Sequence, residues 1–294
     1  MQQYFHCVTF GEILYDILND HKEVGGAPFN VAYHLARMGI GTAMITRVGN
    51  DENGAGLLAF MQQKHLTTAF VQIDHDHETS TVIASQSDAG EMSYEIKEPV
   101  AWDFIECSQE AIDVVSKAAW FIFGSLSSRN KVTEKTLLKL LELPVKKVFD
   151  INMRPPYVDK TRIEQLLMLS DVVKMNDVEF DTICNWNHIA SSEDSLKTII
   201  SRYELETLIV TKGSNGAFMY HNGKRYDNSG YKVNVADTIG CGDAFLSGII
   251  YAFINHIPPQ EAVDFASKLG AFIATRSGAT PDYDKQDVLA ISHS

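Results

Sequence analysis

Short apolar segments alternate along this chain with longer segments whose apolar residues recur at helical spacing. The segments 118–124, 171–176 and 207–213 are apolar over most of their length, which is typical of strands that are buried on both faces. Segment 259–276 instead gathers its apolar residues on one face of a helix. This alternation predicts an α/β fold in which helices cover both faces of a mostly parallel β-sheet.

Two segments, about 12–24 and 79–98, break the alternation. Each has the pattern of short strands joined by polar turns, and the second contains SDAGE, a sequence suited to a hairpin turn. The 294-residue chain has no internal repeat, low-complexity tract or long linker. We therefore expect a single domain, 1–294, that carries a small β-strand lid built from these two segments.

The charge and composition of the chain argue against several classes of protein. A net charge of −13 disfavours a nucleic-acid surface, which needs clustered Lys and Arg. The longest apolar run, near 245–254, falls short of the roughly 20 residues of a membrane span, and the N-terminus lacks the pattern of a signal peptide. The four cysteines are far apart and form no CxxC pair, which disfavours a disulfide framework or a zinc site. We expect a cytoplasmic protein with neither nucleic acid nor membrane among its partners.

The stretch 235–253, VADTIGCGDAFLSGIIYAF, sets glycines and acids directly before an apolar helix. Gly240 and Gly242 can adopt backbone geometries that other residues avoid, so the N–H groups from Gly240 to Asp243 can point into one concavity. The following helix N-terminus adds unpaired N–H groups and a positive dipole end, which favours the ionised form of Asp243. Such a loop binds an anion, and a carboxylate beside it suits a base for a hydroxyl that attacks phosphorus. The alternative is a tight turn followed by a helix cap.

Two further polar stretches follow predicted strands, where open α/β sheets bind ligands. In KMNDVEF, Asn176 and Glu179 lie one helical turn apart and could hold Mg²⁺, directly or through water, near nucleotide phosphates. The alternative for this pair is a helix capping box. In TLIVTKGSNGAFMY, Thr211, Gly213 and Gly216 could let the backbone approach a nucleotide, and the alternative is a plain β-hairpin.

The N-terminal region offers polar groups suited to a polyol. Asp16 follows the first predicted strand, and Asn30 stands at a predicted helix start after the flexible Gly25 and Gly26. A carboxylate accepts hydrogen bonds from two hydroxyls, and an amide both donates and accepts. The alternative is a loop followed by a helix N-terminus. Arg154, after another predicted strand, could reach a phosphate, border a sugar pocket or cap a turn.

Taken in order, these stretches resemble the ribokinase-type (PfkB) family of carbohydrate kinases over essentially the whole chain. The similarity rests on GGAPFNVAYHLARMG with RVGNDENG, on KMNDVE, on TKGSNGA and on DTIGCGDAF. Four motifs in the same order make the resemblance specific. It implies a ribokinase-like fold and a transfer of phosphate from ATP, with Mg²⁺, to a sugar hydroxyl.

The resemblance also implies a role for each stretch. Asp243 matches the catalytic base, and Gly240, Cys241 and Gly242 match the anion hole, with Cys241 where alanine is usual. The other matches are Asn176 and Glu179 with the magnesium and phosphate motif, Thr211, Gly213 and Gly216 with the nucleotide loop, and Asp16, Gly26 and Asn30 with the sugar contacts.

A monovalent cation is a further ion that the resemblance implies. Many relatives bind one through backbone carbonyls, so K⁺ joins ATP and Mg²⁺ among the expected ligands. In this chain the carbonyls would come from the turn that contains Asp237 and Ile239 and from the loop that contains Ile273, Arg276 and Gly278.

Within the family, GGAPFNVA and DINMRPPYVD are most similar to fructokinases, which makes fructose the first expected sugar. 2-Keto-3-deoxygluconate kinases share the DxNxR pattern, and another sugar or a nucleoside stays open as the acceptor. A non-catalytic sugar sensor is the alternative from another class, although it should have lost the base or the glycines that this chain retains. Apolar lid strands could pair across two subunits and form a homodimer.

Segment 74–78, DHDHE, has two histidines that would point the same way on an extended segment. It lies between a predicted strand and the lid, without a distant partner for a metal site. We expect a solvated loop here.

Overall fold

A central β-sheet runs through the middle of the computed structural model, which describes residues 4–18, 21–86, 92–190 and 193–292. Within those residues the sheet has nine strands, and its neighbours run parallel except for β11 with β12 and β12 with β13. In spatial order the strands are β13 (Lys224–Asn228), β12 (Ala217–His221), β11 (Thr207–Thr211), β10 (Val172–Asn176), β9 (Lys146–Asp150), β8 (Trp120–Gly124), β1 (Cys7–Phe10), β4 (Thr42–Gly49) and β5 (Val71–Asp74).

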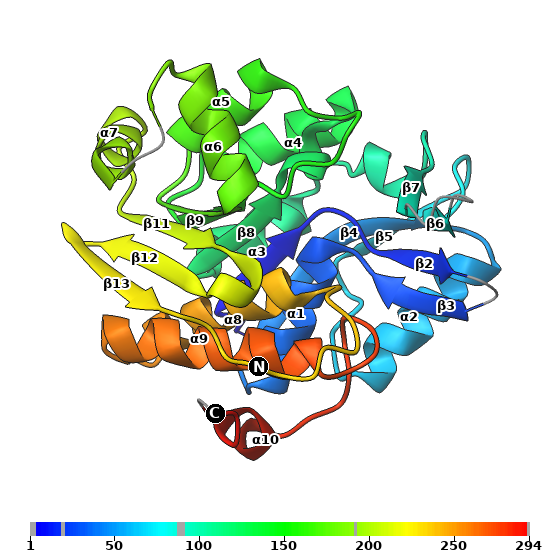
Figure 1. Cartoon of the computed structure of the whole chain (residues 1–294). Helices are drawn as coiled ribbons and strands as arrows, with labels where there is room; N and C mark the ends of the chain where they lie inside the picture. Colours follow the sequence, from blue (N-terminus) through cyan, green and yellow to red (C-terminus); the bar gives the residue numbers. More distant parts are fainter. Residues whose placement is uncertain (1–3, 19–20, 87–91, 191–192, 293–294) are drawn as a thin grey trace.

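The helices divide between the two faces of this sheet, as Figure 1 shows. Alternate residues of β1 point to opposite cores, because side chains alternate along a strand: Val8 and Phe10 join one core and Cys7 the other. The expected fold, a mostly parallel sheet covered on both faces, is confirmed. The first core lies under α3 (Gln109–Lys117), α4 (Lys131–Leu141), α5 (Lys160–Met168), α6 (Asp177–Trp186) and α7 (Glu193–Arg202), and the opposite face carries α1 (Ala27–Arg37), α2 (Glu52–Gln63), α8 (Cys241–Ile254) and α9 (Pro259–Ala274).

A second, smaller sheet stands beside the central one. Its strands, in spatial order, are β3 (His21–Gly25), β2 (Leu14–Leu18), β6 (Thr81–Gln86) and β7 (Met92–Ile96). β2 runs antiparallel to β3 and parallel to β6, and β6 runs antiparallel to β7. Because β2 follows β1 closely and β3 leads into α1, this smaller sheet is attached next to the carboxyl end of β1 (Figure 1).

The segment 74–78 differs from the expected solvated loop at its first residue. Asp74 ends β5 with only 1% of its surface exposed. Its carboxylate lies 2.8 Å from the Nε of Arg47 and accepts the backbone N–H groups of Asp76 and His77 at 2.8 and 2.9 Å. Burying this carboxylate requires such partners, so Asp74 closes a turn. In the part of the chain that the structure describes, no group of three or more His, Cys, Asp or Glu side chains is arranged to hold a metal.

The strand order places a crevice at the carboxyl ends of β1 and β8. The chain leaves β1 toward β4 and β5, whereas it leaves β8 toward β9, β10 and β11 on the other side. Open α/β sheets bind ligands where the strand order reverses in this way.

None of the helices within the described ranges is long and apolar enough to cross a membrane. The short α10 (Lys285–Leu289) closes the fold by adding Val288 to the core beneath α9.

Candidate active site

The N-terminus of α8 opens onto this crevice. Gly240, its N-cap, has a left-handed backbone with φ 76°, and a Cβ there would lie 2.6 Å from the Cβ of Ala279. Only glycine therefore meets both the conformation and the space. A glycine N-cap has no side chain to accept the N–H groups of the first turn. The Cys241 N–H donates to the Thr238 carbonyl at a long 3.4 Å, and the N–H groups of Gly242 and Asp243 face the open helix end, where a ligand can accept them.

Gly242 differs from what the sequence suggested. It lies within α8 rather than in an unusual backbone conformation, so conformational freedom does not explain it. A Cβ on Gly242 would instead lie 2.9 Å from the Nζ of Lys174. Glycine at this position leaves room for a buried ammonium group directly beside the first turn.

Asp243 occupies the first turn of α8 and faces α1. Its Oδ2 accepts a hydrogen bond from the Nδ2 of Asn30 at 2.8 Å. Burial and the nearby Asp150 raise the pKa of Asp243 to about 6, although Lys174, the hydrogen bond from Asn30 and Arg154 act in the opposite direction. The helix dipole was expected to favour the ionised form, but burial and a like charge outweigh it. A carboxyl with a pKa close to neutral is well matched to general base catalysis.

Lys174 and Asp150 form a buried ion pair that the sequence interpretation missed. The Lys174 Nζ lies 3.0 Å from each Asp150 oxygen, and the two residues are 7% and 3% exposed. Burial lowers the pKa of Lys174, but the charges of Asp150, Asp243 and Glu179 outweigh it and hold that pKa above its ordinary value. The available signal was a lysine inside the apolar strand DVVKMN.

Asn176 and Glu179 join β10 to α6 in a reciprocal capping box. The Glu179 N–H donates to Asn176 Oδ1 and the Asn176 N–H to Glu179 Oε2, both at 2.8 Å, and the Met153 N–H donates to Glu179 Oε1 at 2.7 Å. The helix capping box, which was the alternative interpretation of this pair, is therefore present. Burial and Asp150 raise the pKa of Glu179, which lies close to the Lys174 ion pair.

A cavity of about 600 Å³ extends from the turn between β11 and β12 to the start of α8. Thr211, Gly213 and Gly216 line one end, and Cys241 and Gly242 line the other. The structure thus brings the predicted nucleotide loop and the predicted anion hole to one cavity, and β11 and β12 also form the hairpin of the alternative interpretation. The sequence interpretation missed most of its apolar lining, which is Tyr231, Val233, Val235, Phe245, Ala271 and Ala274.

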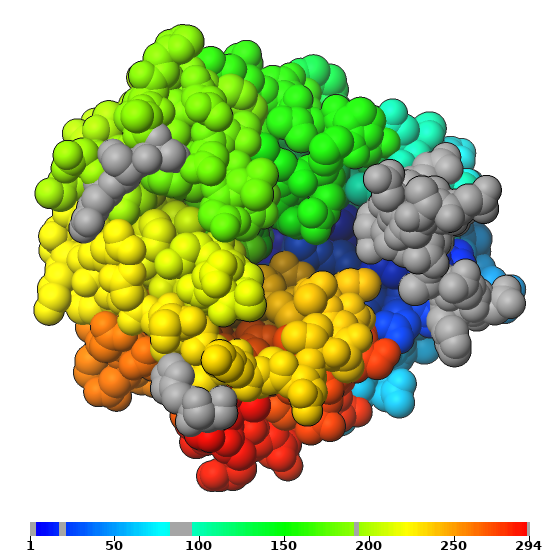
Figure 2. All heavy atoms as spheres, viewed as in Figure 1, coloured from blue at the N-terminus to red at the C-terminus, as the bar shows by residue number. Residues whose placement is uncertain are grey.

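The residues predicted to bind sugar gather around the other side of Asp243. Asn30 lies in the first turn of α1 and is 3% exposed, and Gly26 caps that helix with φ 108°. Burial raises the pKa of Asp16 to about 6, whereas the positive charge of the exposed Arg154 opposes the rise. The side chains of Asp16 and Arg154 are therefore close enough to interact electrostatically. Figure 2 shows this region as a recess, with blue N-terminal atoms between the green and the yellow-orange segments.

Glu12 is a further acid at this recess that the sequence interpretation passed over. It is 2% exposed, and its Oε2 has no hydrogen-bond partner among the described residues. Burial raises the pKa of Glu12 to about 7; the charge of Asp243 adds to this rise, whereas the charges of Arg154 and Arg129 oppose it. Its side chain adds a carboxyl group to the polar floor of the site.

The two segments predicted to hold a monovalent cation lie together. The Gly278 N–H donates to Asp237 Oδ2 at 3.2 Å, and the Asp237 N–H donates to the Ala274 carbonyl at 3.3 Å. The Ile239 N–H donates to Asp237 Oδ1 at 3.0 Å, and the Arg276 N–H donates to the Ile273 carbonyl at 2.9 Å. Asp237 therefore joins the turn before α8 to the loop after α9.

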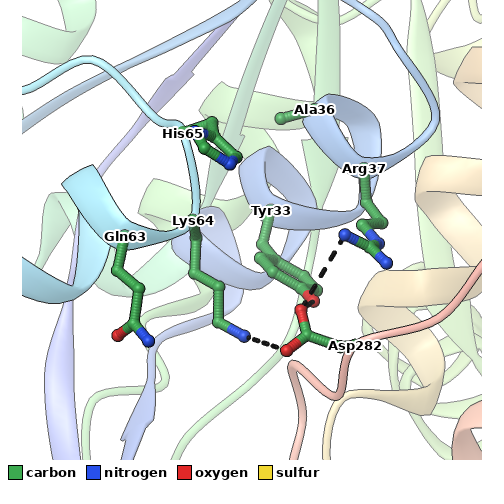
Figure 3. A pocket seen from close by; sticks show the side chains of 7 residues that line it. All are labelled: Tyr33, Ala36, Arg37, Gln63, Lys64, His65 and Asp282. Carbon is green, nitrogen blue, oxygen red and sulfur yellow. Dashed lines mark hydrogen bonds and ion pairs between the residues drawn. The ribbon is translucent and has the colours of Figure 1, made fainter.

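A separate cavity of about 360 Å³ lies on the outer side of this loop (Figure 3). Tyr33 donates its hydroxyl to the Pro281 carbonyl at 2.6 Å, and Lys64 donates to Asp282 Oδ2 at 2.9 Å. Arg37 approaches the same carboxylate at 3.9 Å. These contacts tie the segment after Gly278 to α1 and to the residue that follows α2.

Comparison with known proteins identifies the family. The family model for pfkB family carbohydrate kinases matches residues 5–286. The chain belongs to the PfkB family of carbohydrate kinases. It is 28% identical to Fructokinase-1 of Oryza sativa subsp. japonica over 303 residues, with 93% of both chains covered, and 28% identical to the fructokinase of Escherichia coli over 273 residues, with 87% of both covered.

Solved structures support the ribokinase-like fold. A fructokinase from Xylella fastidiosa with bound ATP superposes with a TM-score of 0.87 at 24% identity, covering 97% of both chains. A fructokinase from Vibrio cholerae O395 in a form with fructose, ADP and potassium ion bound gives a TM-score of 0.82 at 23% identity, covering 99% of both chains. This sugar kinase of the PfkB family therefore shares its whole architecture with these proteins.

Proposed function

We propose that this chain is a fructokinase, which transfers the γ-phosphoryl group of ATP to a hydroxyl of fructose. The observation that carries the proposal is the position of Asp243. Its carboxyl has a pKa of about 6, stands at an uncapped helix N-terminus, and lies between the cavity at Gly242 and the side chain of Asn30. The choice of fructose is supported by full-length similarity to fructokinases from a plant and a bacterium.

In the proposed reaction Asp243 accepts the proton of the attacking sugar hydroxyl. A bond forms between that oxygen and the γ-phosphorus, and the bond from the γ-phosphorus to the β–γ bridging oxygen breaks, so ADP leaves with the bonding electrons. The N–H groups at the start of α8 stabilise the negative charge on the transferred group, because their partial positive charges point toward it before the reaction begins.

Glu179 and Asn176 fit a role in holding Mg²⁺, which neutralises phosphate charge when it is bound. Both Glu179 oxygens already accept a backbone N–H, at 2.7 and 2.8 Å, and the side chain is buried. Glu179 therefore suits contact with the ion through water better than direct coordination. Asn176 is exposed at the end of β10, on the side of the sheet where the cavity lies.

The smaller sheet is proposed to close over the sugar. Asp16 lies in β2 of that sheet, and Glu23 of β3 contributes to the field at Asp16. Closing this sheet would exclude water from Asp243 and the phosphate, which limits hydrolysis of ATP. K⁺ is proposed to bind backbone carbonyls of the turn before α8 and the loop after α9, which Asp237 joins, and so to stabilise the start of α8.

The test is an assay of fructose, ribose, glucose, 2-keto-3-deoxygluconate and a nucleoside with ATP and Mg²⁺. The proposal predicts the highest kcat/KM for fructose. A higher value for 2-keto-3-deoxygluconate or a nucleoside would retain the kinase mechanism and replace the substrate. Binding of sugar without turnover for every compound would favour a sensor and overturn the proposal.

A further inference from the structure

Lys174 is a buried cation that the proposed reaction has not used. An ammonium group has three N–H donors. Two of them serve the oxygens of Asp150, at 3.0 Å each. The third donates to no group in the described ranges, although Lys174 is only 7% exposed. Burying an ammonium group with an unused donor is costly, which indicates that a ligand supplies the missing acceptor.

The unused donor has an opening at the first turn of α8. A Cβ on Gly242 would lie 2.9 Å from Nζ, so the space that this glycine leaves open connects the ammonium group with the helix N-terminus. Gly242 also lines the 600 Å³ cavity that reaches from the turn between β11 and β12. The inner end of that cavity and the buried ammonium group therefore meet at one residue.

The local charges require a cation at this point. Asp150 and Glu12 lie close enough to Asp243 to interact with its charge, and Glu179 acts on Lys174; each of these three carboxyl groups is less than a tenth exposed. A triphosphate entering such a site would be repelled unless positive charge stood near its end. Arg154 is the other cation in the field of Asp243, and it is exposed.

We propose that the Nζ of Lys174 donates a hydrogen bond to the γ-phosphoryl group of ATP through the space beside Gly242, and that Asp150 is the positioning residue that aims it. The inference rests on the proposed phosphoryl transfer and adds a catalytic residue to it. Lys174 approaches from β10, whereas the N–H groups approach from α8, so the transferred group is held from two sides. The opposing possibility is that Lys174 only neutralises Asp150.

The experiment compares ADP with AMP-PNP, which differ in the γ-position. Dissociation constants for both, with Mg²⁺, are measured by calorimetry for the wild type, Lys174→Met and the double variant Lys174→Met/Asp150→Asn. The double variant removes both charges of the pair, so it keeps the fold where Lys174→Met alone leaves a buried unpaired carboxylate. Lys146→Met, on the adjacent strand and paired with Glu206 at 2.7 Å, is the control for the loss of one positive charge.

The inference predicts that the double variant binds AMP-PNP about 10- to 100-fold more weakly, the loss expected for a hydrogen bond to a charged group. Its affinity for ADP, and the ratio of the two affinities in Lys146→Met, should change less than about 3-fold. An unchanged ratio in the double variant would overturn the role of Lys174 and leave the proposed function intact. A wild type that binds neither nucleotide would overturn both.

Discussion

Replacing Asn30 by leucine tests how the site controls the protonation of Asp243. Asn30 donates to Asp243 Oδ2 at 2.8 Å, and its own Oδ1 has no hydrogen-bond partner within the described residues. Leucine keeps the volume and removes the donor. Because the hydrogen bond stabilises the ionised carboxylate, its loss raises the pKa of Asp243 above the value of about 6.

The size of the effect follows from the strength of a hydrogen bond to a charged group. A bond worth about 1.5–3 kcal/mol corresponds to about 1 to 2 pH units. The ionised fraction of Asp243 at pH 7 would fall from about 90% to about 50% or less. Asp150, Lys174, Arg154 and the nearby Glu12 stay in place, so the change reports the hydrogen bond alone.

The assay is kcat against pH from 5 to 9, with fructose and ATP saturating. Saturation matters because Asn30 is also a proposed sugar contact, and a weaker KM would otherwise hide the shift. The acid limb of the wild-type profile should move upward by about 1 to 2 pH units in Asn30→Leu. A fall in kcat with an unmoved acid limb would refute the assignment of that limb to Asp243.

Three further outcomes follow from the structure. Gly240→Ala would place a Cβ 2.6 Å from that of Ala279 at φ 76°, whereas Gly39→Ala would have φ 83° and open space around its Cβ. In urea denaturation, Gly39→Ala should lower the free energy of unfolding by about 1 kcal/mol and Gly240→Ala by clearly more. Equal losses would contradict the crowding at Gly240. Burial lowers the pKa of His34 to about 4, so its stabilising contribution is present above the unfolded pKa of about 6.5 and about 3 kcal/mol of it is lost as pH falls to about 4; His34→Gln should flatten that part of the stability profile. Replacing K⁺ by tetramethylammonium should lower kcat several-fold, and an unchanged kcat would contradict a cation beneath α8.

The sequence predicts the layers of this fold well, because strands buried on both faces and helices with one apolar face leave clear patterns. It does not predict β5, whose strand VQID is short and half polar, or β13, whose strand KRYDN carries charges to the edge of the sheet. Both are strands because a neighbouring strand pairs with them, which is a tertiary effect.

The site is predictable where chemistry is local. The left-handed Gly240 and the spacing of Asn176 and Glu179 can be inferred from a few adjacent residues. The pair of Lys174 and Asp150 cannot, because it depends on the parallel register that sets these two residues opposite each other on β10 and β9. The pKa of Asp243 likewise depends on Asp150, which lies 93 positions away in the chain, so the helix dipole alone gave the wrong direction.

The central claim is that Asp243 removes the proton from the sugar, and Asp243→Asn tests it most directly. Asparagine keeps the shape of the side chain but cannot act as the base at this position. Calorimetry should give dissociation constants for fructose and ATP within about 3-fold of the wild type, while kcat falls by about 10²- to 10⁴-fold. A variant that binds both ligands and turns over at close to the wild-type rate would contradict the claim.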